Sequence, residues 1–250
     1  MTHLKESFSQ QFPIPFSKFA PNQSAEMVWA NERMTSGYPT FEYKINEYGL
    51  RFDTDEKEEA ICFAGCSHTF AQGVDQYKGF AEIVAKEKNA QCINVGMPAA
   101  GPDVQMLNLT WAVEKFKNIK SIVWYMSQPL RQIVYDGYIH TFVPPRIDFF
   151  ENRKLAKQFL NVNFTLDQTI ATKTYWNVYT FLNLMKARNI NVYMHCWDDK
   201  FNYQLQPLIK EYCIEIGDMN NIDKARDEAH NGIKSHQDFA ERILETMNEI

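Results

Sequence analysis

Five short hydrophobic runs recur along the chain, separated by longer segments in which apolar residues follow a helical spacing. The runs lie at 59–65, 91–95, 121–126, 191–196 and 212–216. They are nearly continuous, whereas strands with one face in solvent alternate between apolar and polar residues. The pattern therefore predicts five strands that are covered on both faces.

The segments between and after these runs predict helices. They lie near 80–84, 104–111, 167–188 and 239–247, and Gly101-Pro102-Asp103 is a start signal for the second. Alternation of strand and helix predicts an α/β fold: a three-layer, doubly wound, mainly parallel five-stranded sheet of the flavodoxin-like kind. Ligands bind such sheets at the carboxyl ends of the strands, so the loops after the five runs are where function is expected.

Two segments depart from this pattern. Residues 1–58 are rich in Pro, Phe and polar residues, and we expect an irregular N-terminal extension packed on a single domain of residues 59–250. Residues 132–166 form a long insertion with many aromatic side chains. Long loops at the ligand edge of a sheet often serve as a lid or a substrate wall. The alternative is that the aromatic side chains only pack over the edge of the domain, and the pattern does not choose between the two.

Composition excludes several classes of partner. A net charge of −5 and the absence of a basic stripe argue against nucleic acid binding. No apolar run approaches the roughly 20 residues that span a bilayer, and the N-terminus lacks the apolar region of a secretory signal. The five cysteines are odd in number and show no zinc-binding spacing. We expect a soluble, cytoplasmic protein with free thiols and no metal; nothing in the pattern indicates an oligomeric state.

The first candidate for chemistry is Ser67, which follows Gly65 and Cys66 at the end of the first run. A glycine at a strand end allows a sharp turn, and N–H groups at the start of a following helix favour a developing negative charge. These are the needs of a serine nucleophile with an oxyanion site. The alternative is an ordinary turn, because Gly-x-Ser turns are common. We expect the neighbouring His68 to point away from the serine.

Two further candidates lie after other runs. Asp227 precedes His230 by three residues, so the acid can bond one ring nitrogen and leave the other to take a proton from a serine. The alternative is an acid at a helix start beside a surface histidine. Gly96 follows the second run, and its N–H could donate to an oxyanion, although an ordinary turn is the alternative. Loops after the first and last strands can meet in this architecture.

In this order the segments resemble the conserved blocks of SGNH (GDSL-type) hydrolases. The run from Gly65 to Thr69 is similar to the first block, whose serine is the nucleophile. Asn94-Val95-Gly96 resembles the second block, in which the glycine N–H serves the oxyanion hole. Asp227-Glu228-Ala229-His230 resembles the final Asp-x-x-His block, which supplies acid and base. The resemblance implies the SGNH fold and makes residues 59–250 a catalytic domain.

The first and third blocks are altered, and one earlier segment adds to the resemblance. Cys66 stands where the family has Asp, and Ser127 and Gln128 stand where an asparagine donates to the oxyanion. The implied donors are therefore the N–H groups of Ser67 and Gly96 with the side chain of Ser127 or Gln128. An Asn-x-x-Gly-x-Arg segment, here Asn46 to Arg51, also precedes the serine block in many members.

The expected activity is ester hydrolysis through an acyl-enzyme. His230 takes the proton from Ser67, Asp227 orients His230, and water releases the acid, with no metal or organic cofactor. Tyr125, His195 and Trp197 are candidates for contact with a small-molecule or carbohydrate ester; a role in the core is the alternative. The aromatic loop favours a sugar O-acyl ester. Two other functions remain open: a non-catalytic binding module with this fold, and an O-acyltransferase using the same triad.

Overall fold

The five predicted strands form one parallel sheet in the computed structural model, which describes residues 24–26, 42–135, 139–142, 167–225 and 229–249. The strand order is β4-β3-β5-β8-β9, and every neighbouring pair is parallel. The strands are β3 (Ala60–Gly65), β4 (Gln91–Asn94), β5 (Ile119–Met126), β8 (Asn191–Cys196) and β9 (Ile214–Glu215). The predicted α/β class with a five-stranded parallel sheet is confirmed.

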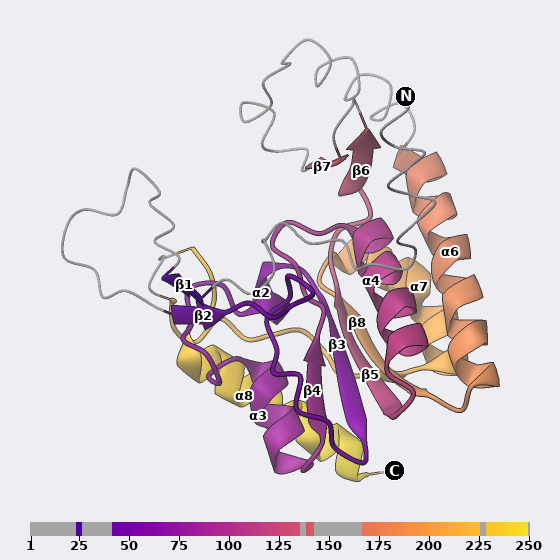
Figure 1. Cartoon of the computed structure of the whole chain (residues 1–250). Coiled ribbons are helices and arrows are strands. Elements are labelled where there is room, and N and C mark those ends of the chain that lie inside the picture. The colour runs from indigo at the N-terminus through magenta and orange to yellow at the C-terminus, as the bar shows by residue number, and fades with distance from the viewer. Residues whose placement is uncertain (1–23, 27–41, 136–138, 143–166, 226–228, 250) are drawn as a thin grey trace, which may run out of the picture.

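The chain reverses its direction of travel across the sheet at β3. From β3 it crosses to β4 on one side, and then to β5 on the other. A reversal of this kind opens a crevice at the carboxyl ends of the two strands that flank it, here β3 and β5. The short helix α2 (Ser67–Phe70) begins two residues after β3 ends, and it lies at this edge of the sheet (Figure 1).

Helices cover both faces of the sheet, which makes three layers (Figure 1). The pair α3 (Phe80–Glu87) and α8 (Ile233–Asn248) packs on one face. The other face carries α4 (Pro102–Lys115), α6 (Asp167–Ala187) and α7 (Asp199–Tyr212). The described part of the chain has no helix that combines the length and apolarity needed to cross a membrane.

Successive residues of β5 enter two separate hydrophobic clusters. Ile122, Trp124 and Met126 belong to the cluster beneath α4, α6 and α7, whereas Val123 and Tyr125 belong to the cluster beneath α3 and α8. Alternate side chains of a strand point to opposite faces, so a strand buried on both faces must be apolar at every position. This packing explains the continuous hydrophobic run that predicted the strand.

Two of the helices begin at residues that favour the start of a helix. Helix α4 starts at Pro102, as the start signal predicts, and Gly101 precedes it. Glycine is required at position 101 because a Cβ there would lie 1.7 Å from the carbonyl oxygen of Arg131. Helix α7 starts after Asp198, whose carboxylate accepts a hydrogen bond of 3.0 Å from the amide of Phe201.

The last strand is shorter than the sequence predicts. Only Ile214 and Glu215 pair with β8, because α7 continues to Tyr212 and ends at Cys213. A short apolar run does not by itself distinguish the end of a helix from a strand. The prediction of a strand over 212–216 was therefore wrong at its start, although a strand exists there.

Two small antiparallel ladders lie outside the main sheet. One joins β1 (Ser24–Glu26) to β2 (Glu42–Lys44), and the other joins β6 (Gln132–Tyr135) to β7 (Ile139–Phe142). The second ladder opens the insertion at 132–166, most of which lies outside the described residues, so lid and packing remain alternative interpretations. The division at residue 58 likewise stays a prediction.

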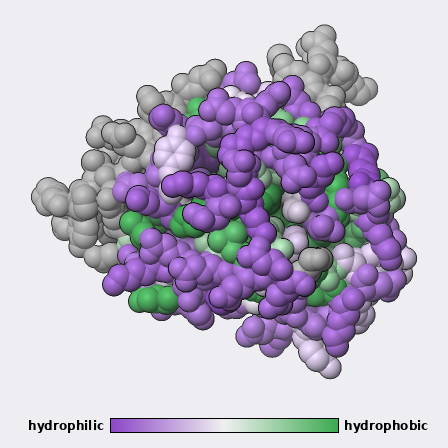
Figure 2. Space-filling view, turned by 90° about the horizontal axis from the view of Figure 1, so that it is seen from below, coloured by the Kyte–Doolittle hydropathy of each residue, from purple (hydrophilic) through white to green (hydrophobic). Residues whose placement is uncertain are grey.

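The face of the molecule at the amino ends of the strands is mainly hydrophilic. Figure 2 shows this face from below, with hydrophobic atoms only in small separated patches. Solvated polar surface of this kind offers little to an apolar partner.

Candidate active site

Ser67 lies at the start of α2, directly beyond β3. The preceding turn requires a glycine, because a Cβ at Gly65 would lie 2.6 Å from the carbonyl oxygen of Tyr125 and 2.1 Å from Thr69 Oγ1. The side chain of Ser67 is largely buried, and its hydroxyl lies 3.9 Å from the sulfur of Cys66. Cys66 itself is only 1 % exposed, as expected for a thiol at the end of an apolar strand.

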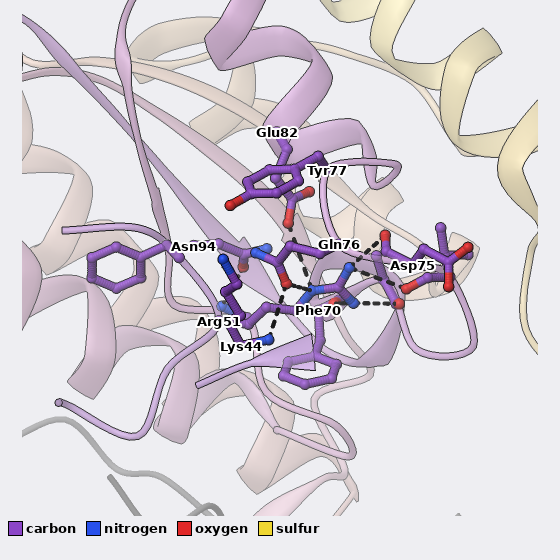
Figure 3. Close-up of polar contacts among 12 residues, drawn as sticks. Lys44, Arg51, Phe70, Asp75, Gln76, Tyr77, Glu82 and Asn94 are labelled. Atoms are coloured by element: carbon purple, nitrogen blue, oxygen red, sulfur yellow. Dashed lines mark hydrogen bonds and ion pairs between the residues drawn. The ribbon is translucent and has the colours of Figure 1, made fainter. Parts of the chain in front are cut away.

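The segment after α2 is held by a buried arginine from the N-terminal region. Arg51 is fully buried, and its guanidinium donates hydrogen bonds of 2.7–3.1 Å to four carbonyl oxygens. These carbonyls belong to Phe70, Ala71, Val74 and Asp75. The Gln76 side chain also accepts from Arg51, and the Glu82 carboxylate lies 3.7 Å away. Figure 3 shows the guanidinium pointing into this loop.

Asn46 explains the spacing of the Asn-x-x-Gly-x-Arg segment. Its side-chain oxygen accepts hydrogen bonds of 3.0 Å from the amides of Tyr48 and Leu50, and its amide group donates to the carbonyl of Phe52. Gly49 completes the turn with a φ of +75° that other residues rarely adopt. The turn delivers Arg51 into the loop that follows Ser67.

Gly96 lies against α2, where the second block predicts it. A Cβ at this glycine would lie 2.9 Å from the amide nitrogen of Phe70, so only glycine permits the approach. Its N–H, however, donates a hydrogen bond of 2.9 Å to the side-chain oxygen of Asn94. Asn94 is fully buried and also donates to the carbonyl of Thr69 at 2.8 Å. The predicted oxyanion donor is therefore hydrogen bonded within the protein in this structure.

Ser127 is similarly engaged. Its hydroxyl is fully buried, donates to the carbonyl of Ala100 at 2.7 Å, and accepts from the side-chain amide of Gln105 at 2.8 Å. Gln105 in turn accepts a hydrogen bond from the indole of Trp124. A hydroxyl has a single proton to donate, and here it is used. Gln128, the other candidate for the third oxyanion donor, is partly exposed, and its role stays a prediction.

His230 lies on the loop before α8. A bridge between Lys224 and Asn231 closes this loop, and the Ala225 amide donates to the carbonyl of His230. The ring of His230 lies edge-to-face with the ring of His68, with 5.6 Å between their centroids. The loops after the first and last strands therefore meet, as the sequence predicts. Asp227 lies outside the described residues, and its role stays a prediction.

The position of His68 corrects one expectation. Its ring does not point away from the site: it packs edge-to-face against Tyr125 and Trp197 as well as His230, at centroid distances of 6.1 and 6.5 Å for the first two. The residue follows Ser67 within a helical turn, so strand-like alternation does not apply. Burial, followed by the neighbouring His230 and Arg131, lowers the pKa of His68 to about 4. The imidazole is therefore neutral at neutral pH.

The three candidate substrate residues gather beside His68. Tyr125 stacks on His195 at 6.2 Å, and its hydroxyl donates to the carboxylate of Asp218. Burial, together with this hydrogen bond, raises the pKa of Tyr125. His195 is mostly buried, with Nδ1 at 3.5 Å from the Glu215 carboxylate. Burial lowers the pKa of His195 against the opposing effect of the carboxylates.

Sequence reasoning missed Asp218, which follows β9 and carries no motif. Nothing in a linear pattern shows that its carboxylate meets a tyrosine from β5. Among the residues that the structure describes, no three His, Cys, Asp or Glu side chains lie together as a metal site would need.

No family model and no curated protein matches the sequence, but solved structures match the fold. A carbohydrate esterase, described as having divergent catalytic and non-catalytic binding functions at its active site, has a TM-score of 0.51 and 11% identity over 79% of this chain and 70% of its own. A family 2 carbohydrate esterase from Corynascus thermopiles (Myceliophthora fergusii) has a TM-score of 0.50 and 10% identity, covering 79% and 68%. The chain has the SGNH hydrolase fold. A G-D-S-L lipolytic protein from Veillonella parvula has a TM-score of 0.46 and 16% identity, covering 77% and 99%.

The SGNH fold agrees with the placement of the predicted blocks. The serine block follows the first strand of the sheet, the glycine block follows the second, and the histidine precedes the last helix. All three segments lie at the carboxyl edge of the sheet. Ser67 at the start of α2 and His230 on the loop before α8 therefore lie at the same edge of the sheet.

Proposed function

We propose that this chain is a serine ester hydrolase of the SGNH family that acts through an acyl-enzyme. One observation carries the proposal: the loop that bears His230 packs on the helical turn that bears Ser67, through the 5.6 Å contact between His230 and His68. A serine and a histidine brought together at the switch point of a parallel sheet match the needs of nucleophilic catalysis.

In the first step, Ser67 Oγ attacks the ester carbonyl carbon while His230 takes the hydroxyl proton. The oxyanion would be held by the N–H groups of Ser67 and Gly96 and by the side chain of Gln128. Because Asn94 accepts from the Gly96 N–H in the free protein, this donor serves only when it is shared with the substrate or exchanged for it. Collapse of the intermediate breaks the bond to the alcohol, which receives the proton from His230.

In the second step, water attacks the acyl-enzyme. His230 takes a proton from the water, the bond to Ser67 Oγ breaks, and Ser67 recovers its proton as the acid leaves. Asp227 is proposed to orient His230 and to stabilise its protonated form. Atoms and charge balance without a cofactor.

A sugar O-acyl ester is the proposed substrate. Two structures with the same fold are carbohydrate esterases, and the aromatic and polar side chains of Tyr125, His195 and Trp197 gather at the same edge as Ser67. Aromatic rings with hydrogen-bonding partners suit a sugar better than an acyl chain.

The test is covalent labelling by a fluorophosphonate followed by peptide mass spectrometry. We expect one label, on Ser67, and no label on the Ser67→Ala variant. Hydrolysis of acetylated sugars and of p-nitrophenyl acetate should require the same serine. A folded wild-type protein that takes no label and hydrolyses neither substrate would contradict the proposal.

A non-catalytic binding module is the second candidate, and a specific observation favours it. The Gly96 N–H and the Ser127 hydroxyl, two of the donors that an oxyanion hole would use, are hydrogen bonded to Asn94 and Ala100. Losing one donor costs roughly 3–4 kcal/mol of transition-state stabilisation in other hydrolases. Calorimetry with acetylated sugars tests this candidate: binding without turnover or labelling would support it.

A further inference from the structure

The residue beside the proposed nucleophile is a histidine whose hydrogen-bonding capacity is unused. His68 Nδ1 is buried and has no hydrogen-bond partner among the described residues. The same is true of the indole Nε1 of Trp197, whose ring lies 6.5 Å from that of His68. Buried polar groups are nearly always paired in folded proteins, and leaving one unpaired costs about 1–3 kcal/mol. Two such groups in contacting rings mark a place where a ligand would supply the missing partner.

The position of His68 indicates that these two unpaired groups lie near the alcohol portion of the ester. If His230 acts as base and then as acid, it must reach the oxygen of the departing alcohol. His68 packs directly on the His230 ring, so its neighbourhood is that of the alcohol and not that of the oxyanion. The oxyanion donors, by contrast, lie on the backbone around Ser67 and Gly96.

The chemistry of the two side chains defines what they can bind. An indole N–H only donates, so Trp197 needs an acceptor. A neutral imidazole donates through one nitrogen and accepts through the other, and burial holds the pKa of His68 at about 4, so this neutral form is the one present. A hydroxyl group, which both donates and accepts, satisfies either partner. An ammonium group would offer Trp197 no acceptor.

Arg131 limits the way in which Trp197 can contact a ligand. Its guanidinium lies over the indole ring, with 5.0 Å between Cζ and the centroid. One face of the indole is thus covered, whereas both Trp197 and His68 remain partly exposed. Ring stacking on a ligand is blocked at that face, and the buried Nε1, which has no partner among the described residues, is left to form a hydrogen bond.

We infer that His68 and Trp197 form the subsite for the alcohol portion of the ester, and that this alcohol is a polyol with a free hydroxyl next to the acylated one. The inference rests on the proposed function and adds to it the residues that select the alcohol. His68 touches the substrate but takes no part in proton transfer.

The experiment uses two esters with the same acyl group and different alcohols. A mono-O-acetylated glucose carries hydroxyls beside the ester, whereas p-nitrophenyl acetate carries none. We expect His68→Phe and Trp197→Phe each to lower kcat/KM for the acetylated glucose about 10-fold or more, since one hydrogen bond with its unpaired partner is worth about 1.4 kcal/mol or more. For p-nitrophenyl acetate both variants should lose less activity than for the acetylated glucose, so the ratio of the two kcat/KM values should fall in both. Fluorophosphonate labelling of Ser67, which does not involve the sugar, should still occur in both variants.

Trp176→Phe is the matched control, because Trp176 lies on α6 and is 58 % exposed. Trp176→Phe should leave kcat/KM unchanged for both esters. An equal loss on both esters in His68→Phe, at unchanged thermal stability, would overturn the inference by making His68 part of the general machinery. Wild-type rates on the acetylated glucose in both variants would overturn it as well. A wild-type protein that neither labels nor hydrolyses refutes the proposed function itself, a different result from either of these.

Discussion

Side chains around Ser67 differ in how much of their hydrogen-bonding capacity is already used. Asn94 and Ser127 are fully buried and each both donates and accepts. His68 Nδ1 and Trp197 Nε1 have no partner among the described residues. Groups whose bonds are complete hold the loops in place, whereas the two unpaired groups are buried beside the candidate site.

This contrast predicts different outcomes for two adjacent residues. Ser127→Ala removes a buried hydroxyl that bonds both Gln105 and the Ala100 carbonyl, although Gln105 still donates to that carbonyl at 3.0 Å, so the free energy of unfolding should fall by about 1 kcal/mol. Gln128→Ala should leave stability unchanged and lower kcat about 100-fold with little change in KM, the pattern of an interaction made in the transition state. Urea unfolding and steady-state kinetics measure both. A Gln128→Ala enzyme with wild-type kcat would remove Gln128 from the oxyanion site.

Cys66 and Ser67 are adjacent candidates for the nucleophile, and burial separates them. Cys66 is 1 % exposed, which leaves its sulfur little access to a substrate carbonyl. We expect Cys66→Ala to retain most esterase activity and fluorophosphonate labelling, whereas Ser67→Ala is folded and inactive. The reverse pattern, with an active Ser67→Ala protein, would make the enzyme a cysteine hydrolase.

At this scale the sequence predicted part of the site. The serine, glycine and histidine blocks carry local spacing that a reader of the chain can recognise, and the structure places Ser67, Gly96 and His230 at one edge of the sheet. His68 and Asp218 were missed because their contacts join residues far apart in the chain. Such contacts depend on how the elements pack, which spacing along the chain does not encode.

At the scale of elements, α3 and α8 are joined by a histidine that is neutral in the folded protein. His236 Nδ1 accepts a hydrogen bond of 3.2 Å from the amide of Phe80, and its ring stacks on the Phe80 ring. Burial lowers the pKa of His236 to about 3, and the neighbouring His68 and Arg51 lower it further.

The low pKa of His236 predicts a dependence of stability on pH. The unfolded chain binds a proton at this residue near pH 6.5 and the folded chain does not, so stability is fully present above about pH 6.5 and falls as the pH decreases towards 3. The slope from one such group is at most about 1.4 kcal/mol per pH unit. His236→Gln, whose side-chain oxygen can still accept from Phe80, should show a smaller loss between pH 6.5 and 4. Urea midpoints at several pH values check this; equal slopes in both proteins would exclude His236 as the cause.

The strands were predicted well and α7 was not. Continuous apolar runs mark strands buried on both faces, and all five such runs contain a strand. Helix α7 buries Phe201, Leu205, Leu208 and Ile209 on one side, yet its polar remainder and the internal Pro207 hid this periodicity. Asp198, which caps the start of the helix, is a local sequence signal. By itself this signal does not predict a helix, because α7 is also stabilised by its packing on the sheet.

At the scale of the whole molecule, a buried arginine connects the N-terminal segment to the candidate active site. Arg51 precedes residue 59, where the predicted domain begins, yet it holds the loop that follows Ser67. Glu82 of α3 is buried beside it, and burial raises the pKa of that carboxyl more than Arg51 lowers it. Leu50 and Phe52, which flank Arg51, enter the cluster beneath α4.

Removing this charge should destabilise the protein and disturb the site. Arg51→Met leaves the carbonyls of the loop and the Glu82 carboxylate without their partner, and losing one side of a buried pair costs about 3–5 kcal/mol. Arg188→Met is the matched control, because Arg188 pairs with the exposed Glu114 and should matter far less. Urea unfolding compares the two. Similar losses in both variants would show that the buried contacts of Arg51 contribute little.

Gly101, at the start of α4, lies against the backbone of Arg131, whose side chain contacts the proposed alcohol subsite. No side chain fits at this position, because a Cβ would lie 1.7 Å from the carbonyl oxygen of Arg131, and the Arg131 guanidinium lies over Trp197. Even alanine at position 101 would force the Arg131 backbone to move. Under the proposed function, Trp197 lies in the alcohol subsite and Arg131 covers one of its faces. The proposed subsite therefore depends, through Arg131, on the absence of a side chain at the start of α4.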